Sequence, residues 1–293
     1  MRWRRRRRRA WLGCALGGVA LLLLSCDGPI VARSPEALYA LAKQQIAHAN
    51  YSPALDTLSK VIRESPQSEP ARRAHVLRVA LLGGMAQAFK DIAESYLEGH
   101  QQAGAAAYAS QMRSMAIDYF GRARGHSIEL VEALDRLQQE ATPAPWRLDL
   151  PLPQAASGSA VLAKVRQGTW VEDPERAQAE REELRQGLAQ MLAGLVDTEG
   201  NLDRARERLR FRGLPFEVEP ANFYLGAARE LLNLSSIYRP EALRDPRMFR
   251  LFHERAAAAA ARAAQRAAEI GNDRIRDESE QLQRHCQTVL ERG

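Results

Sequence analysis

Four dipeptides constrain the fold more than any other feature of this sequence. Each places serine or aspartate directly before proline, at Ser34-Pro35, Ser52-Pro53, Asp173-Pro174 and Asp245-Pro246. A serine or aspartate at the N-cap accepts a hydrogen bond from a free backbone N–H of the first helical turn. Proline fits the first helical position because no hydrogen bond is lost there. The four pairs therefore predict helix starts in both halves of the chain.

The hydrophobic pattern also has the helical period. Apolar residues recur mostly three or four positions apart at Leu184, Leu188, Met191, Leu192 and Leu195, as one buried helix face requires. Long alternating β-branched runs are missing from the sequence, so we expect an all-α fold of antiparallel helical hairpins. The predicted helices cover about 35–49, 52–64, 70–98, 104–140, 174–197, 202–212, 221–237, 246–270 and 274–291.

Residues 141–159 interrupt this helical pattern. The segment, ATPAPWRLDLPLPQAASGS, contains four prolines and a tail rich in Ser, Gly and Ala, so it is not helical throughout. Its apolar residues alternate at Trp146, Leu148, Leu150 and Leu152. An ordered crossover docked onto the helices, a flexible linker and a strand offered to a partner are three open interpretations. The segment divides the helical part into an N-terminal half, 34–140, and a C-terminal half, 160–293.

The N-terminus has the charge pattern of an export signal. Arg2 and the run Arg4–Arg9 form a basic cluster without acidic residues, and residues 10–25 carry no charge. This uncharged stretch has 16 residues, whereas a membrane-spanning helix needs about 20 apolar residues. A basic cluster followed by a short apolar stretch is typical of a signal peptide.

The uncharged stretch ends in Leu23-Leu24-Ser25-Cys26, which resembles the bacterial lipobox. The resemblance implies that the Cys26 thiol is diacylglycerated, that the chain is cut between Ser25 and Cys26, and that the new N-terminus is acylated. Residues 1–25 would then be removed and residues 26–33 would tether the helical part to a membrane. Two or three acyl chains form a durable anchor, since each buried CH₂ contributes about 0.8 kcal/mol. A plain signal anchor with an incidental cysteine is the alternative.

Removal of residues 1–25 changes the charge and the cysteine content. It takes away seven of the 42 basic residues and none of the 36 acidic ones, so the formal net charge falls from +6 to −1. A nucleic-acid partner is therefore not expected. Cys14 is lost and Cys26 is lipidated, which leaves Cys286 and excludes an intramolecular disulfide and a cysteine-rich zinc site. We expect Cys286 to pack as a small apolar residue, with an intermolecular disulfide as the alternative.

Two stretches of the chain share one spacing. Leu41-Ala42-x7-Asn50-Tyr51-x2-Ala54-x3-Leu58 matches Leu192-Ala193-x7-Asn201-Leu202-x2-Ala205-x3-Leu209. The pattern resembles the tetratricopeptide repeat, which implies helix–turn–helix units stacked into a solenoid. Gln45 departs from the family's aromatic position and Arg212 from a small one, and a third, more degenerate copy begins at Phe223. An irregular helical bundle with coincidental spacings is the alternative.

The sequence contains no local catalytic or metal-binding motif. Its six histidines are scattered singly, and HExxH, GxSxG, P-loop and dinucleotide-binding patterns are missing. Glu182-Glu183 lies beside Arg181 and Arg185, which predicts solvated ion pairs on a helix surface. We therefore expect no enzyme, cofactor or metal site. The enzyme alternative requires polar groups such as His126, His253 and Glu254 to converge in one cleft.

Together these features predict a lipid-anchored, non-catalytic helical scaffold that binds a protein partner at the bacterial cell envelope. The stretch ALYALAKQQIAHANYSPAL resembles the helical lipoprotein of the outer-membrane β-barrel assembly machine, and pilus-assembly pilotins are similar. A weaker resemblance to helical lipoproteins of TRAP-type solute transporters implies a small solute as ligand instead. The expected location is the periplasmic face of the inner or outer membrane, and Asp27 favours the inner one where enteric-type sorting applies.

Overall fold

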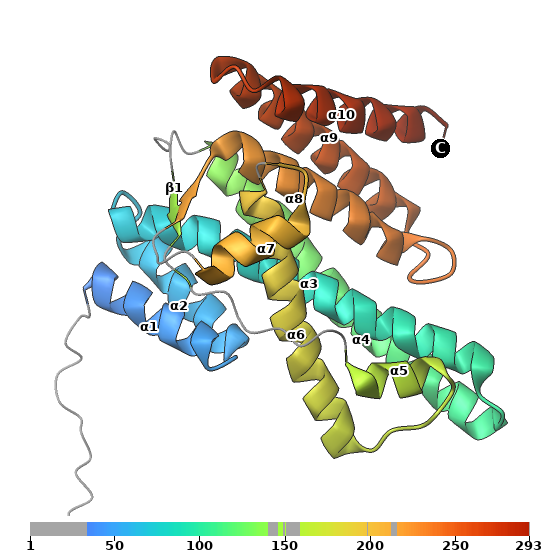
Figure 1. The fold of residues 1–293 in the computed structure, drawn as a ribbon. Coiled ribbons are helices and arrows are strands. Elements are labelled where there is room, and N and C mark those ends of the chain that lie inside the picture. The colour runs from blue at the N-terminus through green and yellow to red at the C-terminus, as the bar shows by residue number, and fades with distance from the viewer. Residues whose placement is uncertain are drawn as a thin grey trace, which may run out of the picture. The chain divides into compact units, whose positions relative to one another are not determined.

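This computed structural model describes residues 34–139, 146–148, 150, 159–197, 199–211 and 216–292. The predicted lipobox, the tether and most of residues 141–159 lie outside the described residues. Figure 1 shows the elements in chain order. They are α1 (Pro35–Ala47), α2 (Tyr51–Glu64), α3 (Glu69–Gln102), α4 (Ala106–Gln139), β1 (Trp146–Leu148), α5 (Ala160–Arg166), α6 (Asp173–Val196), α7 (Leu202–Phe211), β2 (Phe216–Val218), α8 (Pro220–Leu234), the 3₁₀-helix η1 (Ser235–Tyr238), α9 (Pro246–Glu269) and α10 (Asp273–Arg292).

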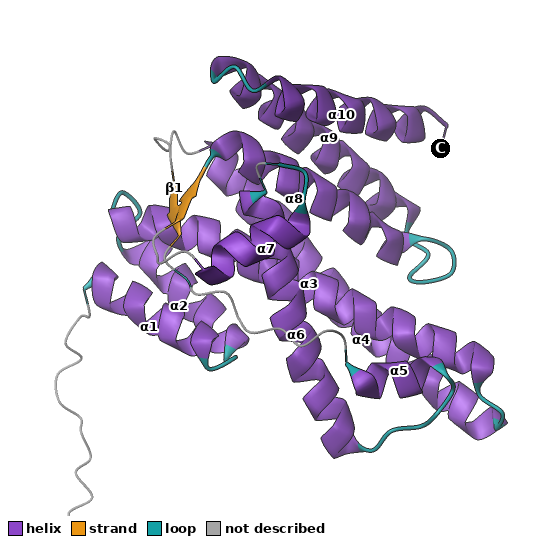
Figure 2. Ribbon diagram, viewed as in Figure 1, coloured by secondary structure: helices purple, strands orange, loops and turns teal. Residues whose placement is uncertain are grey.

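The all-α prediction is confirmed for the described part of the chain, in which two three-residue strands are the exceptions (Figure 2). The long helices α3 and α4 pack along each other, and α6 crosses α3. In the C-terminal part of the chain, α8 packs on α9, and α9 packs on α10. Within the described residues, no helix is long and apolar enough to cross a membrane.

The predicted helix caps are right at two of the four dipeptides. The Ser34 hydroxyl accepts from the Ala37 N–H at 3.2 Å, and the Asp245 carboxylate accepts from the Met248 N–H at 3.1 Å. The prediction at Ser52 is wrong because α2 begins one residue earlier, with Asn50 at its N-cap. The prediction at Asp173 is also wrong, since this residue opens α6 and Glu172 precedes it as N-cap. In both cases the proline still lies in the first helical turn, where it is tolerated.

The helix α3 runs unbroken through Gly83 and Gly84, although glycine has a low helix propensity. Gly84 is required by the crossing with α6, because a Cβ atom there would lie 2.6 Å from the Cα atom of Leu188. A Cβ at Gly187 would in turn lie 2.2 Å from the Gly84 carbonyl oxygen. The two backbones are therefore in direct contact, and this contact replaces the side-chain packing that glycine lacks.

The first predicted hairpin is formed by α1 and α2, and the second by α6 and α7. In the first, Ala42, Ala54 and Leu58 are fully buried. The matching alanines and the final leucine are buried in the second hairpin too. The two hairpins differ at the exchanged position, where Tyr51 is 4% exposed and Leu202 is 44% exposed. The third copy forms no second helix, because α8 continues into η1 and a turn.

Part of the proline-rich segment is an ordered crossover. Trp146–Leu148 pairs antiparallel with Phe216–Val218, with Trp146 opposite Val218. The Trp146 ring lies edge-on to Phe223, with 4.9 Å between the ring centroids. This contact docks the strand onto α8, in agreement with the first interpretation of the segment for the residues that the structure describes. The sequence predicted neither the β2 partner nor the short helix α5.

Candidate ligand-binding cavity

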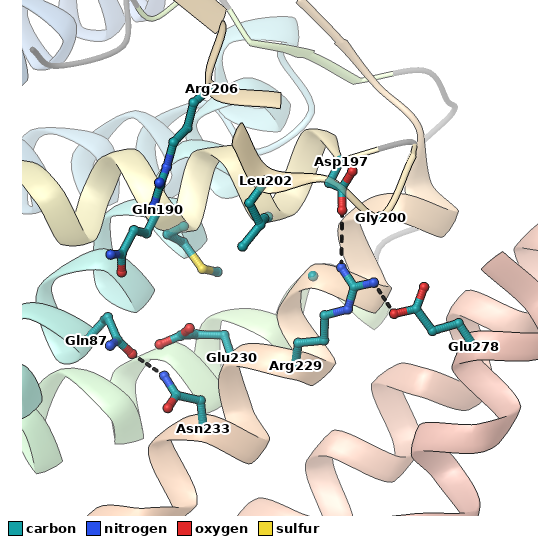
Figure 3. A pocket seen from close by; sticks show the side chains of 13 residues that line it. Gln87, Gln190, Asp197, Gly200, Leu202, Arg206, Arg229, Glu230, Asn233 and Glu278 are labelled. Carbon is teal, nitrogen blue, oxygen red and sulfur yellow. Dashed lines mark hydrogen bonds and ion pairs between the residues drawn. The ribbon is translucent and has the colours of Figure 1, made fainter. Parts of the chain in front are cut away.

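A cavity of about 490 Å³ opens among five helices that are distant in the sequence (Figure 3). Its size falls within the range of small-molecule sites, about 300–1,000 Å³. The lining comes from α3, α6, α7, α8 and α10 and from the α6–α7 turn. It consists of Gln87, Gln190, Met191, Gly194, Asp197, Gly200, Leu202, Arg206, Gly226, Arg229, Glu230, Asn233 and Glu278.

Glycines leave the space that the cavity occupies. A Cβ atom at Gly226 would lie 2.6 Å from the Gly194 carbonyl oxygen, so α6 and α8 cross with their backbones in contact. A Cβ at Gly194 would meet no atom within 4 Å, which shows that Gly194 faces open space. Gly200 has a φ of +71°, a conformation that side chains disfavour, and it turns the chain from α6 toward α7. Gly194 thus leaves open space on the α6 side of the cavity.

A chain of polar side chains links α3 to α8 along the cavity. The Gln87 amide donates to both carboxylate oxygens of Asp91, at 2.8 and 2.9 Å. The Gln87 carbonyl oxygen accepts a hydrogen bond from the Asn233 amide. Burial raises the pKa of Asp91, although the Gln87 hydrogen bonds oppose this. Asp91, which lies outside the cavity lining, therefore orients the Gln87 amide, and Gln87 in turn orients the Asn233 amide.

Glu230 lies beside this chain with an unsatisfied carboxylate. Its Oε1 atom is buried and has no hydrogen-bond partner. Burial raises the pKa of Glu230 to about 8, the negative charge of Asp91 adds to this, and the Asn233 amide and the Lys90 ammonium oppose it. No cation among the described residues forms an ion pair with Glu230. At neutral pH the carboxyl is therefore mostly protonated.

The opposite wall of the cavity carries a compensated charge cluster. The Arg229 guanidinium lies 3.6 Å from a carboxylate oxygen of Asp197 and forms an ion pair with Glu278. Glu278 is also paired with Arg274, at 3.0 Å. The other oxygen of Asp197 accepts from the N–H groups of Glu199 and Asn201, each at 3.0 Å. This cluster holds the α6–α7 turn and the end of the cavity in place.

The histidines of the enzyme alternative lie outside this cavity. His126 stacks on Phe89, with ring centroids 5.6 Å apart, and the His253 Nδ1 is 2.9 Å from the Phe249 carbonyl oxygen. Burial lowers the pKa of both histidines. Glu254 is exposed on α9. The structure does not bring these three residues into the cavity, whose lining contains none of them.

The structure also tests the sequence predictions for Glu183 and Cys286. The expectation that Glu183 is solvated is wrong, because its side chain is buried and accepts from the Ser159 N–H at 3.3 Å. Burial raises its pKa. Cys286 is buried, as expected, and burial raises the pKa of its thiol to about 11. No group of three His, Cys, Asp or Glu residues within the described ranges is placed to hold a metal ion.

Sequence reasoning missed the cavity residues, although a signal was present. The helix α8 is apolar along most of its length, and Arg229-Glu230 interrupts it. Gln87 likewise interrupts the apolar centre of α3. Charged and amide groups inside apolar helices mark buried polar clusters, because a buried polar group requires a partner. Comparisons of the chain with family models, with curated proteins and with solved structures found no match.

Proposed function

We propose that this protein is a lipid-anchored, non-catalytic binding protein of the bacterial cell envelope and that the cavity holds a small solute. The cavity is the observation that carries the proposal. It has the volume of a small-molecule site, and it combines the apolar side chains of Met191 and Leu202 with a few polar groups. Sites of this composition orient a ligand through few hydrogen bonds and gain affinity by burying its apolar surface.

The sequence supports the anchor. A basic cluster, a short uncharged stretch and Leu23-Leu24-Ser25-Cys26 follow one another in the order of a lipoprotein signal. Acylated Cys26 would confine solute binding to a membrane surface, where a transporter can receive the solute.

A protein partner is the second candidate ligand. The α1–α2 hairpin favours it, because its two helices pack together and the small and apolar residues of the repeat resemblance, Ala42, Ala54 and Leu58, are buried. Stacked hairpins of this kind offer extended surfaces to other proteins. If the ligand is a protein, the chain is a lipid-anchored scaffold for envelope assembly.

The anchor is tested by substitution of the cysteine. Cys26→Ala abolishes acylation and moves the protein from the membrane to the soluble fraction, whereas Cys286→Ala leaves both unchanged. Mass spectrometry of the intact chain and fractionation of cells measure the two effects. An uncut, unacylated wild-type chain would refute the anchor.

The solute is tested by a variant that fills the cavity. Gly194→Leu places a side chain in open space inside the cavity, and Gly121→Leu places the same side chain in open space on α4. Each protein is purified from membranes, and the small molecules released on denaturation are identified by mass spectrometry. A solute should accompany the wild type and Gly121→Leu and fall at least tenfold in Gly194→Leu. A specific envelope protein that co-purifies with all three, without a solute, would establish the second candidate.

A further inference from the structure

Glu230 is the one ionisable residue of the cavity lining that forms no ion pair in the described part of the chain. Arg229 is paired with Asp197 and Glu278. Arg206 is paired with Asp203 at 3.2 Å. Glu230 has neither an ion pair nor, at its buried Oε1 atom, a hydrogen bond. Buried carboxylates in folded proteins are normally paired, so an unpaired one in a cavity is a place for a ligand cation.

From this arrangement we propose that the cavity selects a small organic cation, whose ammonium group pairs with the Glu230 carboxylate. The inference rests on the proposed solute-binding function and names the chemical class of the solute.

The surroundings of Glu230 suit an ammonium group. Figure 3 shows the Glu230 carboxyl on the side of Gln87 and Gln190, away from the Arg229 guanidinium. An ammonium group has three N–H donors and no acceptor. The Glu230 carboxylate accepts one of them, and the carboxamide oxygens of the cavity are the acceptors for the others. The apolar part of the ligand then packs against Met191 and Leu202, which also line the cavity.

An anionic solute is disfavoured by the same arrangement. The two arginines of the lining already face carboxylates of the protein, so neither offers a free positive charge. A carboxylate ligand near Glu230 and Asp91 would add to the negative charge that these residues bring to a buried region. A neutral solute would gain no charge pairing with the Glu230 carboxylate.

Binding of the cation displaces one proton. At neutral pH the Glu230 carboxyl is mostly protonated, since its pKa is raised to about 8. When R–NH₃⁺ enters, the carboxyl O–H gives its proton to water and the resulting carboxylate pairs with the ammonium, so the charge of the protein–ligand complex balances. Affinity for a cation therefore rises with pH, by about 50-fold between pH 6 and pH 8, because the ionised fraction of Glu230 rises by that factor.

Other ionisable groups face this region from each neighbouring helix. They are Lys90 and Asp91 on α3, Asp197 in the α6–α7 turn, Arg206 on α7, Arg229 on α8 and Glu278 on α10. Lys90 forms an ion pair with Glu94, and the remaining basic groups are paired as described above. Asp91 is hydrogen-bonded to Gln87 and not ion-paired, and burial raises its pKa as well.

The test uses the full chain and three probes of similar length. They are the cation hexylamine, the neutral hexanol and the anion hexanoate. Isothermal titration calorimetry measures their dissociation constants at pH 6 and pH 8 for the wild type, Glu230→Gln and Glu254→Gln. Glu254 is exposed on α9, so its variant controls for the same chemical change elsewhere. Circular dichroism confirms that each variant is folded.

The expected result is that hexylamine binds at least tenfold more tightly than hexanol or hexanoate at pH 8 and weakens steeply at pH 6. Glu230→Gln should lose this preference, and Glu254→Gln should keep it. If hexanol or hexanoate binds as tightly as hexylamine, or if hexylamine binds Glu230→Gln unchanged, the cation is the wrong class while the cavity remains a solute site. If none of the probes binds, this inference is refuted. The proposed function is then decided separately, by whether a solute is released when the membrane-purified protein is denatured.

Discussion

Replacement of Glu230 by glutamine should stabilise the protein, and the gain should grow with pH. The carboxyl is buried, its Oε1 atom lacks a partner, and its pKa is raised to about 8 from an ordinary value of 4.5. Between these two pH values the folded chain holds a proton that the unfolded chain has released. Its stability therefore falls as the pH rises through this window. Glutamine has nearly the same shape and no charge, so Glu230→Gln removes this penalty.

The size of the effect follows from the two pKa values. One pH unit corresponds to 1.36 kcal/mol, so the penalty on the folded state reaches about 4 kcal/mol at pH 8 and about 1 kcal/mol at pH 5. Glu230→Gln should accordingly raise the free energy of unfolding by about 3 kcal/mol more at pH 8 than at pH 5. For a domain of this size, the melting temperature at pH 8 should rise by about 8 °C.

Urea denaturation followed by circular dichroism at pH 5 and pH 8 measures the effect, with Glu254→Gln as the matched exposed control. Burial also raises the pKa values of Asp91 and Glu183, but both residues remain in the variant, so the difference between the two proteins isolates Glu230. Equal destabilisation by Glu230→Gln at both pH values would refute the reasoning, because it would mean that the carboxylate is ionised and favourably paired in the folded state.

Two further substitutions test the packing. Gly84→Ala should destabilise the protein by about 2 kcal/mol, because the new Cβ would lie 2.6 Å from the Leu188 Cα atom. The backbone of α6, unlike a side chain, cannot rotate to relieve this clash. Gly121→Ala, whose Cβ meets open space in α4, should instead stabilise it by about 0.5–1 kcal/mol; equal effects in urea denaturation would contradict the close crossing. Tyr238→Phe should cost about 1 kcal/mol, since it removes the buried hydroxyl that lies 2.9 Å from the Ser127 hydroxyl. An unchanged unfolding midpoint would show that this hydrogen bond contributes nothing.

The sequence and the structure agree best along α1 and α9. Each begins with proline in the first turn behind the predicted capping side chain, and the buried residues of each recur with the helical period. They agree least at buried polar residues. Glu183 stands in a sequence context that is typical of a solvated face, yet it is buried in the fold and accepts a hydrogen bond from the Ser159 N–H. Such a contact joins residues 24 positions apart, beyond the range of any local pattern.

The sequence by itself determined where helices form, because capping and the i to i−4 hydrogen bond act within one or two turns. It also carried the lipobox resemblance, which lies outside the described residues. Tertiary structure alone decided how the helices cross, since the contacts of Gly84 with Gly187 and of Gly194 with Gly226 join distant segments. These crossings place Gln87, Glu230 and Asn233 around one space. The charge state of Glu230 depends on burial by that packing, and burial is a property of the folded chain that local sequence does not encode.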